Sequence, residues 1–193
     1  MTRPDFSKVD GRSEPFPHFR VPELLSDATA KVLLDWLDEG APWTLRIADF
    51  YEQHEFSMLH CKLPAEVEHM VSEAFIADVG RELSERLRAP HLELVDIAAH
   101  RLVEGQTIRI HNDQISDDET HRLVVQLNRG WSIEQGGLFM VFERDEPDSV
   151  IDVMLPVHRS AFGFEISERS YHAVSTVYSG SRYSLVYTFR RAT

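Results

Sequence analysis

The triplet His111-Asn112-Asp113 carries the sharpest chemical signal in the chain. At a strand end, side chains two residues apart point the same way, so one imidazole and one carboxylate can face the same metal ion. With ten histidines and 32 acidic residues, about 1.7 His-x-acid triplets are expected by chance, and His91-Leu92-Glu93 is a second one. His91 follows the Ala-Pro pair that ends a predicted helix, whereas His111 ends a β-rich run. His111 is therefore the better ligand candidate, and a capping or turn role is the alternative.

A third ligand and an anion receptor lie further along the chain. His172, 59 residues beyond Asp113, completes a set of two imidazoles and one carboxylate, which occupies one face of an octahedral iron and leaves three positions open. Arg182 lies ten residues beyond His172, and its planar guanidinium suits a bidentate carboxylate contact. Ser184 follows on the same face of the same predicted strand. A structural role for His172 and a surface ion pair for Arg182 are the alternatives.

The order of these residues resembles that of the iron(II)- and 2-oxoglutarate-dependent dioxygenases, in the branch similar to prolyl hydroxylases. The resemblance covers roughly residues 91–190. It rests on the metal-ligand order, on the stretch QLNRGWSIEQGG at 126–137, and on GSRYS at 180–184.

The resemblance implies an enzyme that uses Fe(II), O2 and 2-oxoglutarate as cosubstrate, with ascorbate as a stimulant. It implies that 2-oxoglutarate is decarboxylated to succinate and carbon dioxide while a substrate is hydroxylated. A carboxylate as the third ligand favours hydroxylation over halogenation, because related halogenases have a small residue there. The implied iron ligands are His111, Asp113 and His172, and the implied partner of the distal carboxylate of 2-oxoglutarate is Arg182.

One position departs from the family pattern. Where prolyl hydroxylases usually have Tyr-Leu-Asn, with the tyrosine touching the cosubstrate, this chain has Gln126-Leu127-Asn128. Gln126 can donate an amide hydrogen bond instead. Arg122 lies four residues earlier on the same strand face and is expected to point inward, toward 2-oxoglutarate or the substrate. A buried polar network is the alternative for both residues.

Further segments are similar to a group of small bacterial oxygenases, some of which are associated with ribosomally made peptides, including cyclophane-containing ones. These segments are PHF…LLSD at 17–27, and the stretches 41–56, 120–131 and 164–175. We therefore predict a peptide substrate that lies across the mouth of the site and is hydroxylated on a side chain. The predicted contacts are Tyr51, His54 and Trp131, for which packing in the core is the alternative.

Two rival functions stay open at this point. One is hydroxylation of a free amino acid or of a folded protein, as in the prolyl hydroxylase type. The other, from a different class, is a non-catalytic jelly-roll metal-binding module that uses no 2-oxoglutarate. Arg182 argues against the module, because such a protein needs no carboxylate receptor ten residues beyond its last ligand.

The elements that must position these residues include two helices before residue 91. A Ser26/Asp27 cap and apolar residues at helical spacing predict a helix from 27 to about 40, which Gly40 and Pro42 end. A second helix is predicted to begin after Pro64 and to run to about Leu87. Between them, residues 43–60 predict one or two strands with a loop near Gln53.

Eight β-rich runs crowd into the chain after His91, without intervening helices, which predicts antiparallel sheets closed as a jelly roll. The runs are 92–103, 106–111, 121–128, 137–143, 149–156, 160–167, 171–178 and 182–190. The predicted fold class is α+β: mainly β with a helical face, as a double-stranded β-helix.

Residues 1–14 are polar and punctuated by Pro and Gly, which predicts a mobile arm. The length of 193 residues predicts a single dioxygenase domain, at 15–193. Within it, 15–90 supplies helical support and substrate-side strands, and 91–190 supplies the jelly-roll core. The formal net charge of −12 argues against nucleic acid and anionic membranes as partners. Cys61 is the single cysteine, and neither a signal peptide nor a membrane span is recognised, so we predict a cytoplasmic protein. An oligomer is compatible with the sequence but does not follow from it.

Overall fold

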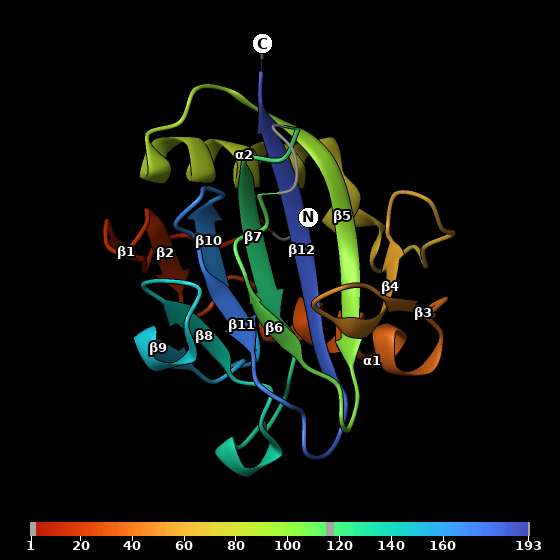
Figure 1. Cartoon of the computed structure of the whole chain (residues 1–193). Helices are drawn as coiled ribbons and strands as arrows, with labels where there is room; N and C mark the ends of the chain where they lie inside the picture. Colours follow the sequence, from red (N-terminus) through yellow and green to blue (C-terminus); the bar gives the residue numbers. More distant parts are fainter. Residues whose placement is uncertain (1–2, 115–117, 193) are drawn as a thin grey trace.

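Two antiparallel sheets form the framework of the protein, and the computed structural model describes residues 3–114 and 118–192. The larger sheet has eight strands in the order β1 (Asp10–Arg12), β2 (His18–Val21), β10 (Ala161–Glu165), β7 (His121–Gln126), β12 (Arg182–Arg191), β5 (Leu92–Leu102), β4 (Glu52–Ser57) and β3 (Thr44–Ile47). The smaller sheet has four strands in the order β6 (Ile108–His111), β11 (His172–Val174), β8 (Phe139–Phe142) and β9 (Val150–Met154). Figure 1 shows the small sheet in front of the large one. The mainly β prediction with a helical face is confirmed.

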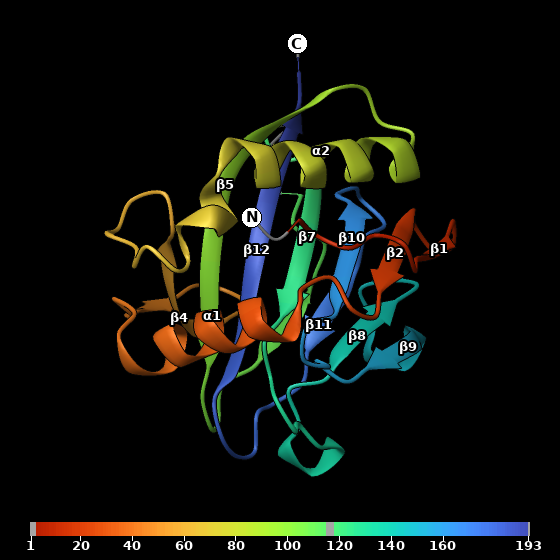
Figure 2. The ribbon, with the colours of Figure 1, turned by 180° about the vertical axis from the view of Figure 1, so that it is seen from behind.

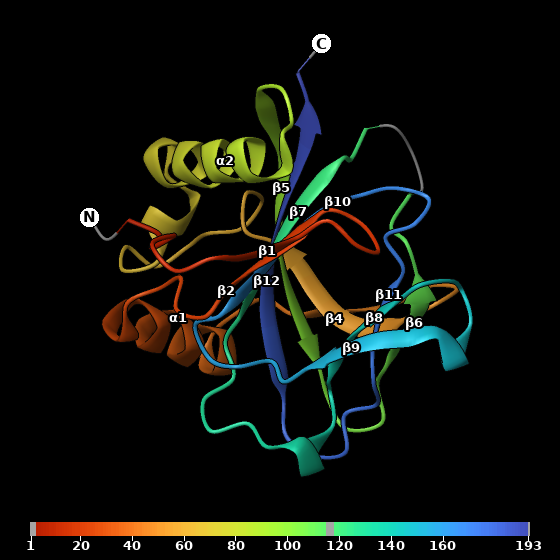
Figure 3. The same cartoon turned by 90° about the vertical axis from the view of Figure 1, so that its left-hand side faces the viewer.

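Two helices cover the outer face of the larger sheet (Figure 2), so that helices, large sheet and small sheet form three layers (Figure 3). Helix α1 (Asp27–Glu39) begins at the predicted cap, where the Ser26 hydroxyl accepts a hydrogen bond from the Thr29 amide at 3.1 Å. Helix α2 (Glu73–Leu87) ends at the predicted residue. Neither helix, in the parts of the chain that the structure describes, is long and apolar enough to cross a membrane.

The predicted start of the second helix, just after Pro64, is wrong. Residues Glu68–Val71 form a separate short 3-10 helix, and the extended backbone of Ser72 (φ −69°, ψ 146°) interrupts the helical path. The Ser72 hydroxyl accepts a hydrogen bond from the Phe75 amide at 3.3 Å and so caps α2. A serine that satisfies a free amide in this way favours a new helix start over continuation.

Each of the eight predicted β-rich runs contains a strand, and all of the recorded strand pairs are antiparallel. The strands predicted within 43–60 are present as β3 and β4, but the loop between them lies at 48–51, ahead of Gln53, which belongs to β4. Strands β1 and β2 were not predicted; β1 falls within the segment 1–14, of which the first two residues lie outside the described range.

Two apolar clusters fill the spaces between the three layers. Alternate residues of a strand face opposite sides, so neighbours on β12 and β7 contribute to different clusters. The first cluster packs under the helices and includes Leu33, Val79, Leu123, Leu185 and Tyr187. The second lies on the opposite face of the large sheet and includes Val124, Phe139, Val141, Phe162 and Val186. Polar residues on this second face therefore point toward the small sheet.

Candidate active site

A cavity of about 340 Å³ is lined by residues of both sheets. The large sheet contributes residues of β3, β4, β5, β7 and β12, and the small sheet contributes residues of β6, β8 and β11. Its polar and charged lining residues are Arg46, Tyr51, Gln53, Glu55, His100, His111, Asp113, Glu119, Arg122, His172, Arg182 and Ser184. Seven of the predicted site residues are thus brought together: Tyr51, His111, Asp113, Arg122, His172, Arg182 and Ser184.

Three of these residues form a group that could hold a metal ion. One potential ligand atom from each of His111, Asp113 and His172 lies within 4.8 Å of the others. His111 Nε2 is 3.2 Å from Asp113 Oδ1, and His172 Nε2 is 3.2 Å from Asp113 Oδ2. Two imidazoles and one carboxylate on one side of a site are the donor set of a non-haem Fe(II) centre.

Hydrogen bonds orient both imidazoles toward this point. His111 Nδ1 donates to the Arg109 carbonyl at 2.8 Å, and His172 Nδ1 donates to the Ser170 carbonyl at 2.7 Å. Because a carbonyl oxygen only accepts, each ring carries its proton on Nδ1 and leaves the Nε2 lone pair free for a metal. Burial also lowers the pKa of His172, with the neighbouring His111 acting in the same direction, so the neutral form that ligates is favoured.

Asp113 reaches the site through a turn, not through strand alternation. Strand β6 ends at His111, and Asp113 has a left-handed backbone with φ 64°. The His111 and Asp113 side chains therefore meet as predicted, but through this turn and not through the predicted alternation along a strand. The Asn112 side chain accepts a hydrogen bond from the Gln114 amide at 3.1 Å, and the Ser170 hydroxyl donates to the Asn112 carbonyl at 2.8 Å. These bonds stabilise an unfavourable backbone conformation of the kind found at functional sites.

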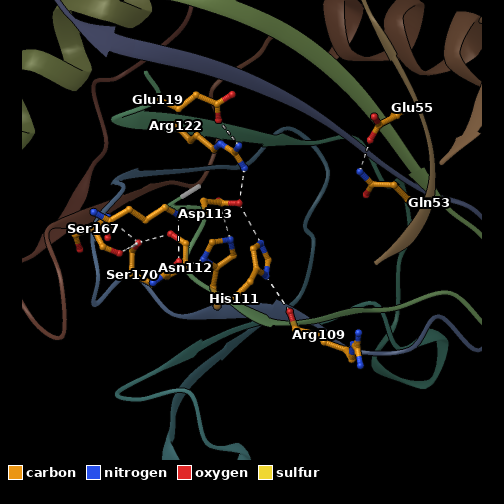
Figure 4. A network of polar contacts seen from close by, with 12 residues as sticks. Gln53, Glu55, Arg109, His111, Asn112, Asp113, Glu119, Arg122, Ser167 and Ser170 are labelled. Atoms are coloured by element: carbon orange, nitrogen blue, oxygen red, sulfur yellow. Dashed lines mark hydrogen bonds and ion pairs between the residues drawn. The ribbon is translucent and has the colours of Figure 1, made fainter. Parts of the chain in front are cut away.

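Arg122 holds one oxygen of the Asp113 carboxylate (Figure 4). Arg122 Nη1 lies 2.7 Å from Asp113 Oδ1, and Arg122 Nη2 donates to Glu119 at 2.6 Å. Burial raises the pKa of Asp113, but the charges of Arg122 and His172 outweigh burial and keep this pKa well below its usual range. Asp113 Oδ2 is buried and has no hydrogen-bond partner within the described residues. One carboxylate oxygen is thus held and the other is available.

Arg182, at the start of β12, is a buried cation with unused hydrogen-bonding capacity. Its side chain is among the largest fully buried ones, and Nε donates to the Gly137 carbonyl at 2.9 Å. Burial lowers its pKa to about 10, so the group remains charged near neutral pH. Nη2 is buried without a hydrogen-bond partner in the parts of the chain that are described. An anionic ligand such as a carboxylate would satisfy both the charge and this donor.

Two of the predicted substrate contacts do not line the cavity, whereas Tyr51 does. His54 lies on β4 between two lining residues, so alternation turns it to the other face of the sheet. The Trp131 indole donates to the Gly136 carbonyl at 2.8 Å and packs against the cluster between the sheets. Trp131 therefore stabilises the turn that precedes β8.

Sequence reasoning missed Gln53, Glu55 and His100. The strand register explains their place: Glu55, His100, Ser184 and Gln126 are successive cross-strand neighbours on β4, β5, β12 and β7. The signal in the sequence is polar residues two apart on β4 and a histidine inside the apolar run of β5. Burial lowers the pKa of His100 to about 3, with Arg122 acting in the same direction, so this imidazole is neutral.

Gln126, at the end of the same row, is buried but is not among the cavity-lining residues. Its side-chain carbonyl accepts a hydrogen bond from Asn128 Nδ2 at 3.5 Å. The Asn128 amide also donates to the Tyr183 carbonyl at 3.0 Å. Gln126 therefore belongs to a polar network next to the cavity.

Solved structures of prolyl hydroxylases share this fold. A prolyl-4-hydroxylase from Pseudomonas putida has a TM-score of 0.69 and 20% identity, over 91% of this chain and 93% of that chain. A prolyl hydroxylase from Trichoplax adhaerens, in complex with a hypoxia inducible factor oxygen degradation domain peptide fragment, has a TM-score of 0.73 and 15% identity, over 90% and 83%. The viral collagen prolyl hydroxylase of Paramecium Bursaria Chlorella virus-1, as a 2OG complex, has a TM-score of 0.66 and 18% identity, over 91% and 96%.

The family comparison concerns the segment that carries the candidate site. No curated protein matches the chain. Residues 97–190, however, match the model of the 2OG-Fe(II) oxygenase superfamily, and all of the candidate metal and carboxylate ligands lie in this segment. That superfamily uses Fe(II), 2-oxoglutarate and O2. Residues 97–190 therefore form a 2OG-Fe(II) oxygenase domain of prolyl-hydroxylase-like fold, and the chain is an oxygenase enzyme.

Proposed function

We propose that the protein hydroxylates a side chain of a peptide, with Fe(II) bound by His111, Asp113 and His172. We propose Arg182 and Ser184 as the binding site for the distal carboxylate of 2-oxoglutarate. The observation that carries the proposal is the buried Arg182 Nη2, which has no hydrogen-bond partner among the described residues and lies in the same cavity as the three metal-ligand candidates. A structural arginine or a bare metal-binding module gives no reason to leave that donor unpaired.

The two facing sheets support a double-stranded β-helix, with 91–190 as its core and 15–90 as helical support and substrate-side strands. The small sheet carries both histidines, whereas β12 of the large sheet carries Arg182 and Ser184. Metal and cosubstrate would thus bind between two rigid sheets. Such placement favours reproducible geometry at the reacting atoms.

Each protein group has a distinct role in this proposal. Iron bound here would supply the activation of dioxygen that is coupled to decarboxylation of 2-oxoglutarate. The imidazoles present neutral Nε2 atoms because their Nδ1 protons are held by backbone carbonyls. Arg122 retains Asp113 Oδ1 and leaves Oδ2 for the metal. Arg182 orients the cosubstrate by its fixed guanidinium.

A peptide substrate is supported by two observations. The Trichoplax prolyl hydroxylase has the same fold and was solved with a peptide fragment. The sequence also resembles oxygenases that are associated with ribosomal, cyclophane-type peptides. Among the predicted substrate residues, Tyr51 lines the cavity and is the contact we retain.

The test is turnover in the presence of Fe(II), 2-oxoglutarate, ascorbate and candidate peptides. We expect one succinate and one carbon dioxide for each hydroxylated peptide, which gains about 16 Da from one atom of O2. Labelled O2 would place one labelled oxygen in the product and one in succinate. If free amino acids drive stoichiometric succinate release and peptides do not, the peptide proposal is wrong. If His172→Ala still decarboxylates 2-oxoglutarate, the ligand assignment is wrong.

A further inference from the structure

Gln53 and Glu55 form a hydrogen-bonded pair on the wall of the cavity formed by β4. Figure 4 shows this pair across the site from His111 and Asp113. Gln53 is 3% exposed, and its Nε2 donates to Glu55 Oε2 at 2.8 Å. A carboxylate only accepts hydrogen bonds, so this contact fixes the orientation of the Gln53 amide. The amide carbonyl must then point away from Glu55.

That carbonyl oxygen, Gln53 Oε1, is buried and has no hydrogen-bond partner within 3–114 and 118–192. A buried acceptor without a donor destabilises a fold, so most native acceptors are satisfied. This one belongs to a cavity-lining residue. A ligand that enters the cavity with a hydrogen-bond donor would satisfy it.

The charges that line the cavity favour a neutral donor. Among the described lining residues there are three cationic and three anionic side chains: Arg46, Arg122, Arg182, Glu55, Asp113 and Glu119. Glu55 is already paired with Arg46 at 3.3 Å. The proposed Fe(II) and the dianion of 2-oxoglutarate add charges that cancel. A substrate ammonium or guanidinium group would therefore be buried without a counter-charge. A neutral N–H donor needs no counter-charge and does not incur this cost.

We propose that Gln53 is a specificity-determining residue that accepts a hydrogen bond from an amide N–H of the substrate. Glu55 is a positioning residue that sets the direction of the Gln53 carbonyl. This inference rests on the proposed hydroxylase function and deepens it, because it names the amide as the group that is recognised. The amide belongs either to the peptide main chain or to a carboxamide side chain.

The probes are N-acetyl tripeptide methylamides that differ in their central residue. Each amide probe is compared with a matched ester, and the ester is made in two ways, which gives two sets of pairs. In the first set one main-chain N–H is replaced by an ester oxygen, and in the second set Asn or Gln is replaced by the methyl ester of Asp or Glu. Binding is measured by calorimetry to the protein loaded with Mn(II) and 2-oxoglutarate. We expect the amides to bind about tenfold more tightly than the esters in one of the two sets, which identifies the source of the amide.

Gln53→Met keeps the length of the side chain but removes the hydrogen-bond acceptor. The ratio of amide affinity to ester affinity is therefore expected to fall to about one in this variant. His54→Met is the matched control, because His54 is adjacent on β4 but does not line the cavity, and it should keep the preference. The proposal is overturned if no amide binds, if wild type binds amides and esters equally in both sets, or if the preference survives in Gln53→Met. The wild-type comparison holds even if that variant fails to fold.

Failure of the proposed function has a different signature. Binding of Mn(II) and of 2-oxoglutarate is titrated first, in the absence of any probe. Loss of the amide preference with intact Mn(II) and 2-oxoglutarate binding counts against Gln53 alone. Absence of Mn(II) or 2-oxoglutarate binding counts against the proposed function, whatever the probes do.

Discussion

His111 and His172 are directly opposite each other on the antiparallel strands β6 and β11. Their ring centroids are 4.2 Å apart. A cross-strand pair on one face of a sheet has a spacing fixed by the hydrogen-bonded ladder. The two imidazoles are therefore positioned by the small sheet itself, and only Asp113 depends on a turn. Strand pairing thus brings together two of the three candidate ligands, although they lie far apart in the sequence.

Removing one imidazole should weaken metal binding strongly. Loss of a residue that only hydrogen-bonds to a metal ligand can weaken metal binding by roughly 100-fold. His172→Ala removes a ligand itself, so we expect Mn(II) affinity to fall by more than that. Calorimetric titration of the purified protein measures this. His54→Ala, at a histidine that does not line the cavity, should bind as wild type does. A His172→Ala protein that binds Mn(II) within tenfold of wild type would contradict the assignment.

Truncating the buried guanidinium should separate cosubstrate binding from metal binding. Arg182→Ala removes a charge-assisted contact in a buried site, so we expect 2-oxoglutarate affinity to fall about ten- to hundredfold. Mn(II) binding should stay nearly intact. Arg182→Lys keeps the charge but lacks the planar guanidinium, so its 2-oxoglutarate affinity should lie between those of wild type and Arg182→Ala. The control is Arg190→Ala, because Arg190 is an exposed arginine of the same strand that pairs with Glu93. Unchanged affinity in Arg182→Ala would move the carboxylate site elsewhere.

The sequence predicted the strands that follow His91 and seven of the residues that meet in the cavity, because both leave patterns in the sequence. Strand runs after His91 alternate or are continuously apolar, and the order of ligand types is specific. What could not be predicted is the three-dimensional register. His100 reaches the cavity because it pairs with Ser184 and Glu55, and no local pattern announces that pairing.

Polar residues on the inward face of β4 explain why the sequence pattern predicted a loop near Gln53. Its inward residues Gln53 and Glu55 face a polar cavity instead of an apolar core, so the strand lacks the hydrophobic alternation that marks a strand. The same alternation excludes His54 from the cavity. The strand period places His54 on the face away from the cavity, and this period can be applied to the sequence only where β4 is recognised as a strand.

Loosening Asp113 should weaken metal binding without removing a ligand. Arg122→Met removes the contact to Asp113 Oδ1, so Mn(II) affinity is expected to fall about 10- to 100-fold, as for other partners of metal ligands. Glu119→Gln keeps Arg122 next to Asp113 but weakens its second ion pair, and a smaller loss is expected. Calorimetry with Mn(II), together with a thermal unfolding curve for each variant, makes the comparison. Equal affinity in wild type and Arg122→Met would refute the role.

His121 should make the fold sensitive to mild acid. Burial lowers its pKa from 6.5 to about 4, with Arg191 acting in the same direction. The unfolded chain takes up this proton near pH 6.5 and the folded chain does not until about pH 4, so the stability present above pH 6.5 is lost as the pH falls through this window. The loss is about 3 kcal/mol. Urea unfolding of wild type and of His121→Gln, which cannot titrate, should diverge by that amount; parallel curves would contradict it.

Gly137 should control the position of Arg182. A Cβ added at Gly137 would lie 2.9 Å from Arg182 Cδ, which is closer than such atoms normally approach. Gly137→Ala is therefore expected to displace the guanidinium and weaken 2-oxoglutarate binding, while the three metal ligands are untouched. Gly130→Ala is a matched control for backbone strain, because Gly130 has φ 66° against 62° for Gly137 and nothing within 4 Å of its added Cβ. Both variants should lose about 1 kcal/mol or more of stability from the left-handed backbone. Only Gly137→Ala should lose 2-oxoglutarate affinity, and an equal loss in Gly130→Ala would attribute the effect to strain instead of to Arg182.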